Sequence, residues 1–169
     1  MYSDGVIDEN IIIELTKKHF GGTIERSTKE EDIDMHVDFW WVSSEGKRYG
    51  FDVKGKKKNK RSDDKKSDEV NWIELKNVLG NPGWLYGKSV YFVFIIGEKA
   101  VYVSKKDLIN LVNKNIIKNK IVHENPLEFY TQYQRKGRKD IIIKVPNNDL
   151  ISISKHIIEL NNENEKNNV

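Results

Sequence analysis

Residues 37–54 read VDFWWVSSEGKRYGFDVK, a pattern typical of a β-hairpin. Two aromatic-rich halves flank a polar connection, and Gly46 suits the left-handed position of a three-residue hairpin loop. A turn centred on Glu45 places Asp38 directly opposite Asp52, since both lie at the same distance from it along the chain. The sequence therefore predicts two aspartates facing each other across neighbouring strands.

Opposed carboxylates are unfavourable in a sheet unless something lies between them. Directly opposed Cβ atoms are roughly 4.5–5.5 Å apart, and like charges at that distance are destabilising. Mg²⁺ or Mn²⁺ would remove this cost, because both ions prefer carboxylate, carbonyl and water oxygens. Asp38, Asp52 and the Val53 carbonyl thus form a candidate metal site. Side chains alternate along a strand, so Lys54 shares the face of Asp52 and is placed to orient an attacking water or to neutralise a phosphate.

A purely structural interpretation competes with this metal site. In it, the same face carries only salt bridges, with Lys54 paired to Asp52 and Arg48 nearby. An isolated Asp-x-Lys triplet has little weight, because a chain with 33% charged residues contains such triplets by chance.

The remaining patterns predict a mixed α/β architecture in one domain, residues 1–160. We expect a polar tail at 161–169 and an apolar stripe of Ile7, Ile11, Leu15 and His19 on the first helix. The expected elements are a helix at 7–20, a strand at 23–27, a charged loop at 28–34, a mobile loop at 55–68, a strand (or short helix) at 70–78, a turn at 80–83, strands at 88–96 and 100–103, a helix at 107–118, a strand at 140–145, and a last helix capped by Asp149 that runs to Leu160.

Charge and composition narrow the function classes. The chain has 169 residues, a net charge of +3 and no cysteine, so disulfides and thiolate metal sites are excluded. The histidines lack the spacing of a zinc site, and no Walker loop or dinucleotide fingerprint occurs. The acidic N-terminus is not a signal peptide, and no apolar run is long enough to cross a membrane. We expect a soluble, intracellular (cytoplasmic) protein.

Two basic runs are candidates for contact with a phosphate backbone. Their candidate residues are Lys56, Lys57, Lys58, Lys60, Arg61, Arg135, Lys136 and Arg138. Trp84, Tyr86 and Tyr133 are candidates for stacking on unpaired bases, although such aromatics more often belong to a core.

The order of a helix with Glu14, a short strand, Asp38, a hairpin turn and Asp52-Val53-Lys54 resembles the PD-(D/E)XK nuclease superfamily. That superfamily includes restriction endonucleases and archaeal-type Holliday-junction resolvases. The resemblance spans residues 9–55 as a motif and 9–104 as topology, with Val37 where the family has its nominal proline.

The resemblance implies a restriction-endonuclease-like fold with an αβββαβ core. It further implies a homodimeric deoxyribonuclease that depends on Mg²⁺ (or Mn²⁺) and acts on duplex or branched DNA. Asp38, Asp52 and Glu14 would hold the metal, and Lys54 would assist the water.

Several alternatives stay open at this point. A second Glu-x-Lys, formed by Glu74 and Lys76, offers a site in which these residues join Asp52 and Asp38 is peripheral, or in which Glu74 is an extra ligand. The stretch 72–86 is also similar to phage-associated nucleases of the superfamily. Other function classes are a catalytically inactive nucleic-acid- or protein-binding module on the same scaffold, and a viral or mobile-element protein that counters a host defence.

Overall fold

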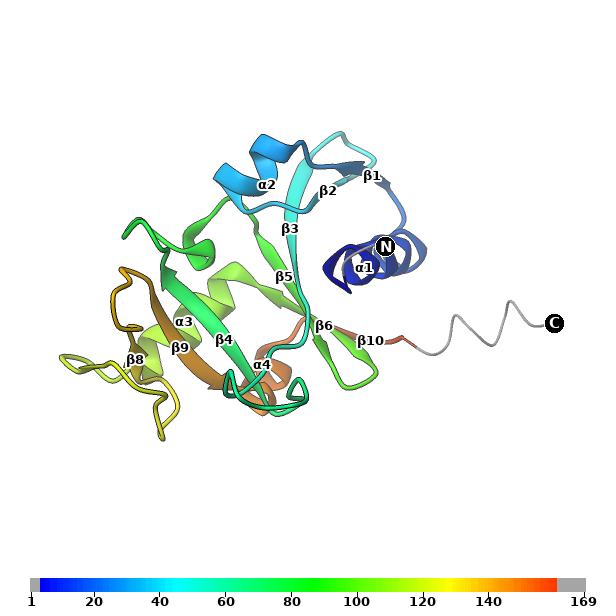
Figure 1. Cartoon of the computed structure of the whole chain (residues 1–169). Coiled ribbons are helices and arrows are strands. Elements are labelled where there is room, and N and C mark those ends of the chain that lie inside the picture. The colour runs from blue at the N-terminus through cyan, green and yellow to red at the C-terminus, as the bar shows by residue number, and fades with distance from the viewer. Residues whose placement is uncertain (1–3, 161–169) are drawn as a thin grey trace.

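The computed structural model describes residues 4–160 and contains two β-sheets and four α-helices (Figure 1). The first sheet has the strand order β1-β2-β3-β5-β6-β10, and the second has the order β4-β9-β8-β7. The strands are β1 (Thr23–Arg26), β2 (Phe39–Val42), β3 (Arg48–Lys54), β4 (Val70–Lys76), β5 (Tyr91–Ile96), β6 (Lys99–Ser104), β7 (Ile121–Val122), β8 (Gln132–Tyr133), β9 (Ile141–Pro146) and β10 (His156–Glu159). The helices are α1 (Asp4–Phe20), α2 (Lys29–Met35), the 3₁₀ turn η1 (Trp84–Tyr86), α3 (Lys105–Asn115) and α4 (Asn147–Ile153).

A hydrophobic core lies on each face of the first sheet, because its central strands are apolar on both sides. On one face, Ile12 and Leu15 of α1 pack with Phe39, Phe51 and Tyr102. The other core joins the sheet to β4, β9, α3 and α4, and its members include Phe92, Phe94, Ile73, Ile143, Leu108 and Leu150. Figure 1 shows α1 on one side of β3 and β5 and the second sheet on the other.

The mixed α/β architecture is confirmed, but one connection differs from the expected αβββαβ core. Strand β3 pairs in parallel with β5, while every other pair in the first sheet is antiparallel. Residues 55–90, which join these two strands, contain β4 and η1 in place of an α-helix. The crossover is therefore made by a strand that belongs to the second sheet.

The charged loop predicted at residues 28–34 is wrong, because this segment forms α2. The Thr28 hydroxyl accepts a hydrogen bond from the Glu31 N–H at 3.2 Å, and the Glu31 carboxylate accepts one from the Thr28 N–H at 3.0 Å. This reciprocal pair is a capping box, whose Thr-x-x-Glu signature is present in the sequence. The high charge of this segment led to the prediction of a loop, although the capping signature marks the start of a helix.

The C-terminal prediction is also wrong in part. Helix α4 begins at Asn147 and ends at Ile153, and residues 156–159 form β10, which pairs with β6. Asp149 lies in the first turn, where its carboxylate accepts a hydrogen bond from the Tyr130 hydroxyl at 2.6 Å. The short strands β7 and β8 were not predicted, and the tail predicted at 161–169 lies outside the described residues.

The two helices and the strands predicted within residues 7–27, 70–78, 88–104, 107–118 and 140–145 are present. The stripe predicted on α1 is shifted, since Ile11 and His19 are exposed whereas Ile12, Ile13 and Thr16 are buried. Within residues 4–160, no helix has the length and apolar character needed to span a lipid bilayer.

Candidate active site and adjoining groove

The hairpin has the predicted register and turn. Phe39 pairs with Phe51, and the Asp38 N–H donates to the Phe51 carbonyl at 2.8 Å, so the next position outward sets Asp38 opposite Asp52. Gly46 has a φ of 81°, which is the left-handed conformation that the three-residue loop requires. The register is confirmed for Phe39 to Val42, and Asp38, directly before β2, continues it toward Asp52 of β3.

Asp52 and Lys54 point from β3 toward the second sheet. Asp52 is only 4% exposed, and its Oδ2 lies 3.0 Å from the Lys54 ammonium. The same ammonium lies 4.1 Å from the ring centroid of Trp84. The ion pair that the structural interpretation predicted is thus present, but Arg48 pairs with Glu25 at 3.1 Å at the far end of the strand.

Three other carboxyl groups act on Asp38, and they belong to Asp52, Asp32 and Glu9. Burial and then the charge of Asp52 raise the pKa of Asp38 to about 8, against a hydrogen bond from the Val53 N–H to its Oδ2 at 2.7 Å. Asp32 of α2 shares a hydrogen bond with Asp38, and Glu9 of α1 adds further repulsion. Ionisation of Asp38 at neutral pH is therefore costly without an added positive charge.

Burial also raises the pKa of Asp52, although Lys54 acts in the opposite direction. The pKa of Glu9 is raised by burial too, with Arg26 opposing and the charges of Asp32 and Asp52 adding to the rise. Desolvation is thus the largest cause of the raised pKa in Asp38, Asp52 and Glu9, and the charges of neighbouring carboxylates add to it for Asp38 and Glu9.

The helical glutamate near the site is Glu9, and the prediction of Glu14 is wrong in position. The Glu14 side chain is 67% exposed and pairs with Lys17 at 3.8 Å. Glu9 lies three and four residues before Ile12 and Ile13, which are buried against the sheet, so it shares their side of α1. The sequence carries no signal for this choice, because Ile11, Ile12 and Ile13 are equally apolar and only the structure shows which of them are buried.

Helix α1 approaches the end of β3 closely at Gly55. A β-carbon placed on Gly55 would lie 2.6 Å from Oδ2 of Asp8. The Asp8 carboxylate therefore occupies the space that a side chain at position 55 would take. Its charge acts on Lys57, whose pKa is lowered chiefly by burial and then by the charge of Lys54.

The alternative site built on Glu74 and Lys76 is not assembled around Asp52. Both residues lie on β4 in the second sheet, with a register irregularity between them, and Lys76 is exposed. The Glu74 carboxylate instead accepts the Trp84 N–H at 3.2 Å. Trp84 thus contacts both Glu74 and Lys54.

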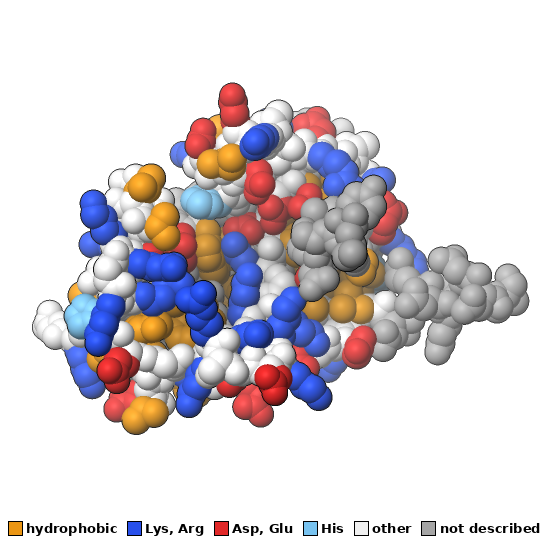
Figure 2. Space-filling model, in the orientation of Figure 1, with side chains coloured by type: hydrophobic (Ala, Val, Ile, Leu, Met, Phe, Trp, Pro, Cys, Tyr) orange, Lys and Arg blue, Asp and Glu red, His pale blue; other side chains and the backbone are white. Residues whose placement is uncertain are grey.

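A groove of about 1050 Å³ runs from Lys54 across the second sheet. Val53 and Glu74 line it, and among its described lining residues Glu74 is the sole acid. Its cationic lining residues come from both predicted basic runs and are Lys54, Lys57, Lys58, Arg61, Arg135, Lys136 and Arg138. Figure 2 shows Lys and Arg side chains gathered around hydrophobic surface over β4, with acidic side chains at the upper end.

Two predicted phosphate-contacting residues lie apart from this lining. Lys56 forms an ion pair with Asp68 at 2.7 Å, and Lys60 is exposed beside the groove without lining it. Arg135 is held by a close ion pair with the buried Asp140, which fixes the wall formed by the second basic run.

The two carboxylates of Asp38 and Asp52 suit a metal ion that retains most of its coordinated water molecules. Within the described part of the chain, no group of three or more His, Cys, Asp or Glu residues is arranged to hold a metal ion. Mg²⁺ is commonly bound through one or two carboxylates with several retained waters. The buried Oδ2 of Asp52 is occupied by the Lys54 ammonium at 3.0 Å, so a bound cation would share this carboxylate with Lys54.

Comparisons with protein-family models, with curated proteins and with solved structures found no match to this chain.

Proposed function

We propose that this protein is a divalent-metal-dependent nuclease that hydrolyses phosphodiester bonds in DNA. The observation that carries the proposal is that the side chains of Asp38 and Asp52 share a hydrogen bond, with the Lys54 ammonium, which lines a basic groove, 3.0 Å from Asp52. This is the chemistry that the resemblance to PD-(D/E)XK nucleases implies, carried by the same residues except for the helical glutamate.

The roles follow from the positions of the side chains. Asp38 and Asp52 would hold Mg²⁺ or Mn²⁺, and Glu9 would contribute through a water. When bound, the cation would lower the pKa of a coordinated water and polarise the phosphate. Lys54 faces the same space and neutralises charge that develops on the phosphate, while the groove cations bind the strand on either side.

The decisive test is cleavage by variants that preserve shape. Asp52→Asn and Lys54→Met are expected to lower the rate at least 100-fold on linear, circular, single-stranded and branched DNA with Mg²⁺. Lys56→Met is the matched control, because Lys56 pairs with Asp68 away from the groove lining. Full activity of both site variants would overturn the proposal.

A second candidate is a nucleic-acid-binding module without catalysis. The ion pair between Lys54 and Asp52 favours it, since an intact pair of this kind is stable without any metal. Calorimetry with Mn²⁺ separates the two functions. Binding that disappears in Asp38→Asn supports the nuclease, whereas retained DNA binding with no metal binding in the unaltered protein supports the module.

A further inference from the structure

The outward face of the second sheet is aromatic and basic, although it belongs to neither core. On β4, Ile73 points into the core, so its neighbour Trp72 points to the opposite face. Lys144 of β9 is paired with Trp72, and Tyr133 of β8 is paired with Ile142. Trp72, Ile142 and Tyr133 all line the basic groove, and the sheet face therefore forms its floor.

Trp72 and Tyr133 form a fixed aromatic pair on this floor. Their ring centroids are 5.8 Å apart, and the Trp72 indole N–H donates to the Lys58 carbonyl at 3.0 Å. Neither residue belongs to a hydrophobic core cluster, whereas Trp84 packs against Phe92 at 5.1 Å. Core packing therefore explains Trp84, whereas Trp72 and Tyr133 are half-buried outside both cores, with the Lys144 ammonium 5.6 Å from the Trp72 ring centroid.

We infer that the groove binds a single polynucleotide strand with its bases turned toward Trp72 and Tyr133 and its phosphates toward the basic walls. This inference rests on the proposed function and names its substrate class. In a duplex the bases are stacked inside and a recessed aromatic floor has nothing to contact, whereas every unpaired base offers a face for stacking.

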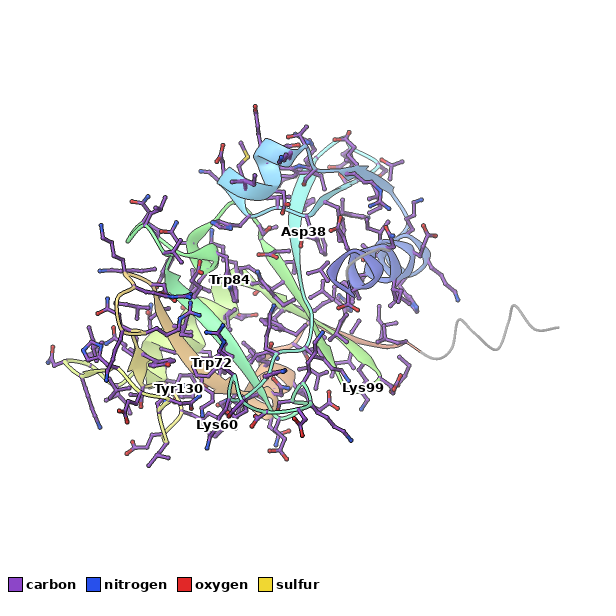
Figure 3. The ribbon with its side chains drawn as sticks, viewed as in Figure 1. Asp38, Lys60, Trp72, Trp84, Lys99 and Tyr130 are labelled. Carbon is purple, nitrogen blue, oxygen red and sulfur yellow. The ribbon has the colours of Figure 1, made fainter. Side chains whose placement is uncertain are left out.

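The walls have the charge that such a strand requires. Lys57, Lys58 and Arg61 come from the segment after β3, and Arg135 and Arg138 come from the segment after β8. Trp84 connects the groove floor with the candidate site, because it lines the same groove as Trp72 and Lys54. In the view of Figure 3, Trp84 lies between Asp38 and Trp72. A strand stacked on the pair would therefore continue along the groove to Lys54.

The test measures binding with hydrolysis removed. Asp52→Asn protein in EDTA is titrated into labelled oligothymidylate of about 12 nucleotides, the matching oligouridylate, and a duplex of equal length. We expect an unpaired strand to bind at least tenfold more tightly than the duplex. Tighter binding of thymidylate identifies DNA as the strand, and tighter binding of uridylate identifies RNA.

Substitution of the aromatic pair gives the second arm. Trp72→Leu, in the same Asp52→Asn background, is expected to weaken single-strand binding about tenfold and to leave duplex binding unchanged, while Trp72→Phe retains most of it. Tyr86→Leu is the control, since Tyr86 is exposed and does not line the groove. Thermal melting of each variant verifies folding.

Equal or tighter binding of the duplex would overturn the inference, as would a Trp72→Leu effect no larger than that of Tyr86→Leu. Because no metal or hydrolysis enters this measurement, a protein that binds single strands but never cleaves would contradict only the proposed nuclease activity. A protein that cleaves but prefers duplex would contradict only the strand inference.

Discussion

The ammonium group of Lys54 lies 4.1 Å from the ring centroid of Trp84 and 3.0 Å from Oδ2 of Asp52. The ring face and the carboxylate hold the cation from two directions. Trp84 is itself held in place, because its backbone N–H donates a hydrogen bond to the Glu74 carboxylate and its ring packs against Phe92. Trp84 is thus a positioning residue for Lys54.

We expect Trp84→Leu to lower the cleavage rate about tenfold, because a cation–π contact of roughly 1 kcal/mol is lost and Lys54 gains freedom. Trp84→Phe keeps a ring face and should retain most of the activity. The cleavage rate at saturating Mg²⁺ is the measurement, with thermal melting to separate a packing defect from misplacement of Lys54. Equal losses in the Leu and Phe variants would contradict a role for the ring face.

The metal-free protein should lose stability as the pH rises. The pKa of Asp38 is about 8 in the folded protein against an ordinary 3.8, so the folded state binds the proton more tightly than the unfolded state. The free energy of unfolding therefore falls between about pH 4 and pH 8, by a few kcal/mol, and levels off above that range. The raised pKa values of Asp52 and Glu9 act with the same sign.

Urea denaturation in EDTA across pH 5–8.5 measures this slope. Asp38→Asn removes the titrating group and should flatten the curve, with its largest gain in stability at the alkaline end. A native protein that becomes more stable over this range would be inconsistent with the burial and repulsion described for Asp38.

Thr28→Ala should destabilise the protein by about 1 kcal/mol, since the hydroxyl that caps α2 is removed. The same substitution frees Glu31, which also accepts the Trp40 indole N–H at 2.9 Å, so α2 would loosen over the hairpin. Equilibrium unfolding in urea is the measurement. Ser44→Ala in the exposed hairpin loop serves as the control and should change stability by less than about 0.5 kcal/mol.

Lys144→Met should expose the segment after β3 to proteolysis. Lys144 is 7% exposed, and its ammonium donates to Oδ1 of Asn59 at 3.0 Å and of Asn125 at 3.1 Å. Loss of these bonds weakens the attachment of Asn59, which keeps the hydrogen bond from Asn125 to its carbonyl, so trypsin should cut within residues 56–66 several times faster. Lys118→Met, an exposed lysine elsewhere, should leave the cleavage rate unchanged.

Local patterns predicted the hairpin because its determinants are contiguous. A Gly at the left-handed loop position and alternating aromatic residues set the register, and the register set Asp38 opposite Asp52. The phase of α1 was not predictable in the same way. Ile11 and Ile12 are equally apolar, and only packing against the sheet buries the second and exposes the first, which directs Glu9 to the site and Glu14 to solvent.

The sequence alone determined the paired aspartates, the lysine beside them and the mixed α/β class, because strand alternation and turn chemistry act over a few residues. Tertiary structure alone decided that β4 belongs to the second sheet and that residues 156–159 form the edge strand of the first sheet. It also decided that both basic runs line one groove with Trp72 and Tyr133. These outcomes depend on pairing between segments that are distant in the chain. The partner of each segment is selected by the apolar area that the two bury together, and local residue preferences do not select it.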